Sequence, residues 1–279
     1  MREIHVNDIS NKVAKLCIKA CIEVSADIRA FMKTACDCEV DLGRLVIEQM
    51  LLNQEIAKSD RLPICQDTGM VVVFVTMGQD VRIVGGGLKD AINEGVRKGY
   101  DEGFLRKSTV ADPINRINKG ENTPAIIHYD IVEGDTFHIT VSPKGFGSEN
   151  MSRLKMLVPA DGIQGIKDFV LETVTLAHSN ACPPIIVGIG IGGNFELSAL
   201  MAKKALLRHL GKPHPDPSWA KVEQELLQEI NATNIGPAGL GGCTTAMAVH
   251  INTYATHIAG LPVAVNIGCH VNRHEEANL

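Results

Sequence analysis

Short apolar segments alternate with helical stretches along most of the chain, and this alternation restricts the fold more than any other feature. Residues 71–75, Val-Val-Val-Phe-Val, are apolar and mostly β-branched, which predicts a strand buried on both faces. Further strands are expected near 125–132, 136–142, 185–187, 245–251 and 263–267. Helices are expected at about 88–102, 163–179, 195–209 and 219–232. Strands that alternate with helices predict an α/β fold.

Two glycine-containing turns bear on how these segments connect. Residues 133–135, Glu-Gly-Asp, predict a hairpin-type turn between the strands at 125–132 and 136–142. Residues 188–193 match G-x-G-x-x-G between a strand and a helix, the pattern of a dinucleotide-binding turn. No acidic residue closes a second strand about 20 positions further on, as that pattern requires. We therefore favour a tight strand–helix turn, and keep a nucleotide-linked oxidoreductase as a minor alternative.

The chain is expected to begin with a helical region, over residues 10–58. Within it, six residues have the spacing of one largely apolar helix face, interrupted only by a glutamine: Leu42, Leu45, Val46, Gln49, Met50 and Leu52. A chain of 279 residues corresponds to one large domain or two small ones. A division is expected near 143–162, giving two α/β subdomains around one site.

Composition excludes several classes of protein. Hydrophobic residues make up 45% and charged residues 21%, as in ordinary globular proteins. The net charge of −5 leaves no basic surplus to attract nucleic acid or anionic lipid. No apolar run approaches about 18 residues, so no membrane span is expected. The first residues lack the apolar core of a signal peptide, and we expect a cytoplasmic protein.

The eight cysteines fall into two groups. Four lie in the helical region and are interpreted as small buried apolar residues: Cys17, Cys21, Cys36 and Cys38. The other four lie in glycine- or proline-rich turns: Cys65, Cys182, Cys243 and Cys269. No C-x2-C pair is present, which argues against a zinc finger or ribbon. Widely spaced cysteines in such turns can converge on an iron–sulfur cluster, although ordinary cysteines remain the alternative at this point.

Three further residues are candidates for chemistry, each with a structural alternative. Asp67 follows Cys65 closely and can act as an acid or base, or can bond its own turn. Arg106 can bind a carboxylate with two parallel hydrogen bonds, or can be a solvated charge. His257 precedes Cys269 by twelve residues, and a lone histidine is more often structural than catalytic.

Read together, ordered segments over almost the whole chain resemble the α subunit of class I, iron–sulfur-dependent fumarate hydratases. The segments that carry the resemblance are 64–69, 105–106 with 112–113, 122–124, 144–150, 180–184, 236–237 with 239–245, and 269–273. The resemblance implies a [4Fe–4S] cluster held by Cys65, Cys182 and Cys269, with one iron left open. Such an iron can act as a Lewis acid on a substrate hydroxyl and carboxylate. Cys243 matches no ligand position.

The resemblance also implies a set of substrate contacts. Gln66 and Asp67 would lie beside the substrate, and Asp67 is the candidate for proton transfer. Arg106 would bind a substrate carboxylate, and Gly147 would offer a backbone amide. His257 would lie near the open iron and the water that leaves or attacks.

The chain departs from the family's pattern at two points, and the second bears on how the enzyme is assembled. The family's Lys-Gly-Gly-Gly-Ser loop contains Phe146 here, which affects the loop and hence the substrate fit. Single-chain members continue into a further domain, whereas this chain stops at Leu279. We therefore expect a separate β subunit that completes the active site, in an α2β2 assembly, and little turnover by this chain alone.

The expected reaction is the reversible hydration of fumarate to malate. A tartrate dehydratase α subunit is the close alternative, and the segment 144–150 favours fumarate. An alternative of another class is a non-catalytic subunit that only binds a cluster.

Overall fold

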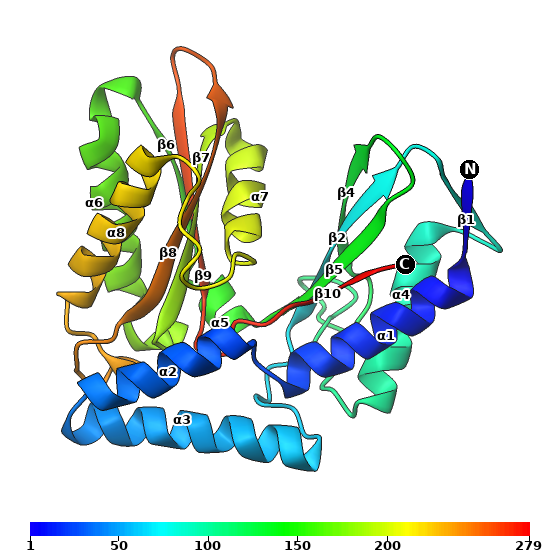
Figure 1. The fold of residues 1–279 in the computed structure, drawn as a ribbon, viewed down its shortest axis with the longest axis horizontal. Helices are drawn as coiled ribbons and strands as arrows, with labels where there is room; N and C mark the ends of the chain where they lie inside the picture. Colours follow the sequence, from blue (N-terminus) through cyan, green and yellow to red (C-terminus); the bar gives the residue numbers. More distant parts are fainter. The chain divides into compact units, whose positions relative to one another are not determined.

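The computed structural model describes residues 1–279 and confirms the α/β fold with a helical N-terminal region (Figure 1). A short strand, β1 (Arg2–His5), precedes three helices, α1 (Val6–Ile22), α2 (Ala26–Cys38) and α3 (Asp41–Asp60). Strands and helices then alternate to the C-terminus. No helix is both long and apolar enough to cross a membrane.

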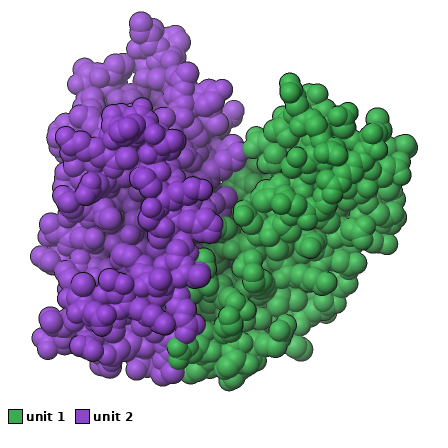
Figure 2. Space-filling model, viewed as in Figure 1, with its two compact units in different colours: residues 1–25, 53–146, 273–279 green, residues 26–52, 147–272 purple.

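The chain folds into two compact units, coloured separately in Figure 2. Unit 1 comprises Met1–Ser25, Asn53–Phe146 and Arg273–Leu279, and unit 2 comprises Ala26–Leu52 and Gly147–Asn272. The chain therefore passes between the units several times, once between Phe146 and Gly147 and once within α3.

Unit 1 is built on a four-stranded sheet in the order β10-β5-β2-β4. These strands are β2 (Met70–Gly78), β4 (Ile126–Val132), β5 (Phe137–Lys144) and β10 (Glu275–Asn278). Helices α1 and α4 (Leu88–Glu102) cover one face, where Val71, Val73 and Val75 enter the core. Strand β3 (Val81–Val84) pairs with β1.

The predicted hairpin around residues 133–135 is wrong. Strand β2 lies between β4 and β5, pairing in parallel with β4 and antiparallel with β5. The turn therefore joins two strands that are not neighbours. A local turn signal cannot reveal that an earlier strand separates the two strands it connects.

Unit 2 contains a second four-stranded sheet, in the order β6-β9-β7-β8. Its strands are β6 (Arg153–Leu157), β7 (Ile185–Gly193), β8 (Ala246–Thr256) and β9 (Leu261–Gly268). Helices α6 (Gly162–Ala177) and α8 (Pro217–Asn231) pack on one face of this sheet and form its main core, and α7 (Phe195–Ala205) packs on the other (Figure 1).

The G-x-G-x-x-G match at 188–193 lies within strand β7, so the predicted strand–helix turn is wrong there. A Cβ on Gly188 would lie 2.3 Å from the Ala202 carbonyl oxygen of α7, and one on Gly190 would lie 2.0 Å from that of Ser198. These glycines let helix α7 approach the sheet closely. The geometry gives them a packing role and removes the basis for a nucleotide site.

Cysteine burial follows the sequence analysis with one exception. Cys17, Cys21 and Cys36 are buried, whereas Cys38 is exposed at the end of α2. Burial raises the pKa of the Cys17 thiol well above its ordinary value. Cys17 and Cys21 belong to the core of unit 1, as the apolar interpretation predicts.

Candidate functional site

The Cys65 turn lies in unit 1 between α3 and β2 and is anchored at its start. The Ile64 amide donates to the Cys21 carbonyl at 2.9 Å, and the Asn53 side chain donates to the Ile64 carbonyl at 2.9 Å. Within the turn, the Asp67 amide donates to Cys65 Sγ at 3.4 Å. The backbone amide of this turn therefore points at the Cys65 sulfur.

Asp67 ties the Cys65 turn to the segment before α5 (Phe146–Glu149). Its Oδ1 accepts from the Gly69 amide at 3.0 Å, and its Oδ2 accepts from the Phe146 amide at 2.7 Å. The bond to Gly69 is a contact within the turn of Asp67 itself, which the sequence analysis gives as the alternative to an acid or base role. Gln66 is exposed beside Asp67. The region around Phe146, expected as a glycine-rich loop, forms the single helical turn α5.

Arg106 is positioned next to this turn by its backbone. The Thr68 hydroxyl donates to the Arg106 carbonyl at 2.6 Å, and the Tyr100 hydroxyl donates to the Thr68 carbonyl at 2.5 Å. The Arg106 residue is exposed, and its guanidinium forms no ion pair. Unit 1 thus presents a thiol, an amide, a carboxylate and an uncommitted guanidinium on connected turns.

Cys182 and Cys269 are brought together in unit 2. Cys182 is exposed, has a left-handed backbone (φ 52°) and precedes β7, and Cys269 follows β9. Because β7 and β9 are antiparallel, with Ile186 opposite Gly268, both cysteines lie at the same end of the sheet. The His270 amide donates to the Cys182 carbonyl at 3.2 Å, and His270 Nδ1 lies 3.2 Å from the same oxygen.

A glycine-rich loop at 236–242 supports the Cys182 turn. The Ala238 amide donates to the Pro183 carbonyl at 2.9 Å. Gly239 (φ 77°) approaches Ser179 so closely that a Cβ there would lie 2.8 Å from the Ser179 Cα. Gly147 also adjoins this turn, since a Cβ on it would lie 3.6 Å from the Asn180 carbonyl oxygen.

Replacing Gly239 by alanine is expected to destabilise the chain by roughly 2–3 kcal/mol, because strain at positive φ adds to the overlap with Ser179. Gly211 is the matched control, since its φ is also 77° but a Cβ there would meet no atom within 4 Å. Gly211→Ala should cost only about 1 kcal/mol. Urea unfolding of both variants measures the difference, and equal midpoints would show that Gly239 does not support the turn.

Cys243 is bound to the buried carboxylate of Glu39 and forms no hydrogen bond with the other cysteine turns described above. Cys243 Sγ donates to Glu39 Oε1 at 3.4 Å, and the Thr244 amide donates to the same oxygen at 2.6 Å. Desolvation, followed by the bond to Glu39 and its charge, raises the pKa of the Cys243 thiol. A protonated thiol is a poor metal ligand, which agrees with leaving Cys243 out of the ligand set.

The structure does not bring His257 to Cys182 and Cys269. His257 is exposed in the turn between β8 and β9, where its Nδ1 accepts from the Ala259 amide at 3.2 Å. From this turn, β9 returns over eight residues, roughly 25 Å, to Cys269. His257 and the two cysteines of the same chain therefore lie at opposite ends of the sheet.

The donor set of the cysteine turns fits an iron–sulfur cluster. Cys65, Cys182 and Cys269 form no disulfide and are at least partly exposed, and Cys65 accepts an amide hydrogen bond. Thiolates are the protein ligands of such clusters, and hydrogen bonds to sulfur tune them. The three cysteines are divided between the units, and no group of three His, Cys, Asp or Glu side chains forms a metal site.

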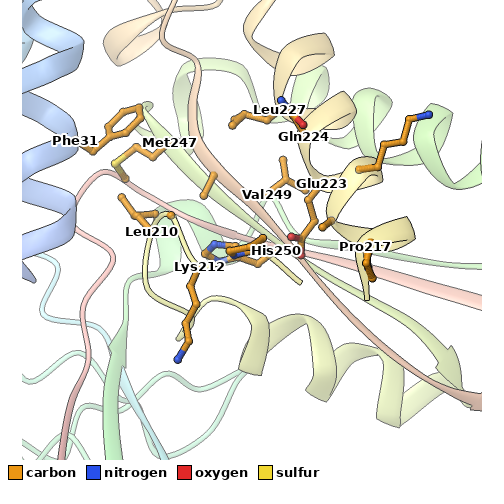
Figure 3. Close-up of a pocket in the computed structure, with 15 residues that line it drawn as sticks. Phe31, Leu210, Lys212, Pro217, Glu223, Gln224, Leu227, Met247, Val249 and His250 are labelled. Carbon is orange, nitrogen blue, oxygen red and sulfur yellow. The ribbon is translucent and has the colours of Figure 1, made fainter. Parts of the chain in front are cut away.

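A separate pocket of about 750 Å³ in unit 2 contains none of the expected site residues (Figure 3). Its walls include Phe31, Leu227 and Met247, together with the buried pair of His250 and Glu223. Glu223 forms an ion pair with Arg208 at 2.5 Å. Burial, followed by the charge of Arg208, lowers the pKa of His250 to about 4.

The neutral state of His250 predicts a pH dependence of stability. As pH falls below 6.5, the unfolded chain gains a proton at His250, whereas the folded chain gains it only near pH 4. The contribution of this residue is therefore complete at pH 8 and falls by about 2 kcal/mol at pH 5. Unfolding of the wild type and of His250→Gln at both pH values isolates the contribution of His250 to the free energy of unfolding. An equal loss of stability in both proteins would contradict it.

Comparison with known proteins places the chain in a family. The model of the fumarate hydratase (fumerase) family matches residues 10–278. A putative L(+)-tartrate dehydratase subunit alpha of Methanocaldococcus jannaschii is 41% identical over 277 residues, covering 95% of each chain. The L(+)-tartrate dehydratase subunit alpha of Escherichia coli K12 is 32% identical over 273 residues, covering 96% of this chain and 89% of the relative. The chain therefore belongs to the class I fumarate hydratase family of hydro-lyases.

Proposed function

We propose that the chain is the α subunit of a two-subunit hydro-lyase that removes water from L(+)-tartrate. The observation that carries the proposal is that His270, the residue after Cys269, contacts the Cys182 carbonyl through its amide and its ring, in a chain whose relatives are named as tartrate dehydratase alpha subunits. The names of these relatives favour tartrate over the fumarate expected from the sequence. They also support a β subunit as partner.

The proposed cofactor is a [4Fe–4S] cluster bound by Cys65, Cys182 and Cys269. Class I enzymes of this family are generally iron–sulfur dependent. When bound, such a cluster supplies an open iron that polarises the departing hydroxyl of a 2-hydroxy acid. His270 would hold the Cys182 turn, and the Asp67 amide would support the Cys65 sulfur.

The remaining roles belong to side chains of the Cys65 turn and its neighbours. Arg106 is exposed and unpaired, so it can take a substrate carboxylate through two parallel hydrogen bonds. Gln66 and the Gly147 amide are proposed as further substrate contacts. Asp67 is the proposed proton-transfer partner, because each carboxylate oxygen that accepts one amide keeps a second lone pair. His257 stays a prediction from the resemblance, and its position adds no support.

Fumarate hydration is the second candidate, favoured by the family model that matches the chain. Assaying the anaerobically reconstituted chain with and without its β subunit distinguishes the candidates. We expect turnover only with both subunits, and a higher kcat/KM for L(+)-tartrate than for fumarate or malate. Faster turnover of fumarate would select the second candidate. Full activity of this chain alone would overturn the two-subunit assignment.

A further inference from the structure

The segment that carries Arg106 is an irregular stretch of backbone. Between the end of α4 and the start of β4, the chain forms neither helix nor strand. Leu105 anchors this stretch in the core of unit 1, where it is 1% exposed. Backbone groups outside helices and sheets need other hydrogen-bond partners, and polar side chains can supply them. The position of Arg106 therefore depends on the side chains that bond the backbone around it.

Asn122, near the end of the same stretch, is a buried side chain that bonds this backbone. It is 1% exposed, and its left-handed backbone (φ 61°) is a conformation that asparagine adopts more readily than most residues. Its Oδ1 accepts from the Ser108 amide at 2.7 Å and from the Thr109 amide at 3.1 Å. Asn122 thus holds the backbone two and three residues after Arg106.

The nitrogen of the same side-chain amide bonds the turn that carries Asp67. Asn122 Nδ2 donates to the Gly69 carbonyl at 3.1 Å, and the Gly69 amide in turn donates to Asp67 Oδ1. A second link runs beside this one, since the Thr68 hydroxyl donates to the Arg106 carbonyl at 2.6 Å. All of these residues belong to unit 1. The Asp67 turn and the Arg106 segment are therefore joined within one compact unit.

Only a side-chain amide satisfies both sides of the Asn122 link. The Ser108 and Thr109 amides are donors and need an oxygen, whereas the Gly69 carbonyl is an acceptor and needs an N–H group. A carboxylate at this position would offer no donor, and its second oxygen would face the Gly69 carbonyl. A shift of either segment would leave a buried polar group unpaired, which is strongly unfavourable. The buried amide therefore fixes the two segments relative to each other.

We propose that Asn122 is a positioning residue, which holds the Arg106 segment at a fixed distance from the Asp67 turn. The inference rests on the proposed function, in which Arg106 binds a substrate carboxylate and Asp67 transfers a proton. Two groups act on one small substrate only when their separation is fixed, and a misplacement of about 1 Å can lower the rate about a hundredfold. Asn122 is buried and acts through the two segments that it joins.

Hydrogen–deuterium exchange of the full-length chain tests the link without reference to activity. Asn122→Gly accepts the left-handed backbone but removes both sides of the link. The amides of Ser108 and Thr109 should then exchange roughly tenfold faster, because they lose their acceptor. The amide of Gly69 should also exchange faster, because its turn is no longer held from Asn122.

Asn93→Asp is the matched control for the exchange measurement. Asn93 also accepts a backbone amide with its Oδ1, that of Ala125 at 2.9 Å, but its Nδ2 donates to a carbonyl of its own helix, α4. This variant should leave exchange in the Asp67 turn and the Arg106 segment unchanged. Unchanged exchange at Gly69 in Asn122→Gly would overturn the proposal, whatever the substrate of the enzyme.

Steady-state kinetics with the β subunit tests whether the enzyme uses the link. Asn122→Asp keeps the oxygen that holds the Arg106 segment and loses only the donor to Gly69. We expect it to raise KM, and to lower kcat/KM per bound iron roughly ten- to a hundredfold, for the dicarboxylate that the wild type turns over best. A smaller fraction of folded enzyme would instead leave KM unchanged. Asn93→Asp should have wild-type kinetics.

A double variant tests whether Asn122 acts through Arg106. The KM of Asn122→Asp combined with Arg106→Met should equal that of Arg106→Met alone, because the positioned group is already absent. Multiplying effects on KM, or a wild-type KM in Asn122→Asp, would overturn the proposal. A wild type that turns over no dicarboxylate would refute the proposed function, while the exchange measurement would still decide whether Asn122 links the two segments.

Discussion

Replacing Cys182 by alanine should abolish both cluster binding and turnover, the largest effect expected of any single substitution in this chain. After anaerobic reconstitution, we expect about four iron and four sulfide per wild-type chain and almost none in Cys182→Ala. The physical reason is that only two of the three proposed ligands, Cys65 and Cys269, would remain to hold the cluster. Activity with the β subunit should fall to background.

Cys243→Ala is the matched control, because Cys243 is also exposed in a glycine-rich turn of unit 2. Its thiol is engaged by Glu39 and kept protonated, so its loss should leave iron and sulfide content unchanged. Iron content that is insensitive to Cys182, or that depends on Cys243, would disprove the proposed ligand set. Circular dichroism of both variants verifies that the fold is intact.

The order of helices and strands could be predicted from local patterns, because burial imposes a period on the sequence. The helix at 88–102 and the strands near 125–132 and 263–267 appear close to their expected bounds. Local patterns could not predict the order of the strands within each sheet. The position of β2 between β4 and β5 depends on contacts more than fifty residues apart.

Two patterns show that residue spacing does not identify the surface that the residues face. The apolar spacing over 42–52 predicts a helix face, and α3 confirms the helix, yet most of these side chains are exposed. The glycines of residues 188–193 resembled a phosphate-binding turn, yet they are strand residues that admit helix α7. Small side chains permit close approach of any group, whether a helix backbone or a ligand.

The sequence predicts the candidate ligand cysteines of the site, but not the residues that hold their turns in place. Turns rich in glycine and proline single out Cys65, Cys182 and Cys269 by their local composition. The residues that hold those turns come from distant segments and have no local signal, as Tyr100 illustrates for the Cys65 turn and His270 for the Cys182 turn. The segment Cys269-His-Val-Asn-Arg273 was recognised only by resemblance, and the structure supplies physical reasons for its histidine and arginine.

Arg273 is the buried cation that connects the last segment of unit 1 to the Cys65 turn. The residue is 5% exposed, and its Nε donates to the Pro143 carbonyl at 3.1 Å. Its Nη2 donates to the carbonyl of Asp67, and its own carbonyl accepts from the Ser142 hydroxyl at 3.1 Å. One guanidinium thus joins the turn that carries Cys65 to the strand end that leads into α5.

Arg273→Met should therefore destabilise the chain by about 4 kcal/mol, because it removes charge-assisted hydrogen bonds and leaves buried carbonyls without donors. Arg273→Lys keeps the charge but cannot reach both carbonyls with a planar fork, so an intermediate loss is expected. Urea unfolding of the cluster-free chain measures these differences without reference to activity.

Arg106→Met is the matched control for the Arg273 variant, because Arg106 is exposed and unpaired. Its stability should stay within about 0.5 kcal/mol of the wild type. In the reconstituted enzyme, however, it should raise KM for the dicarboxylate, since it removes the proposed carboxylate contact. The two arginines would then separate support of the Cys65 turn from substrate binding. Equal urea midpoints for Arg273→Met and the wild type would show that the contacts of the buried guanidinium do not hold this turn.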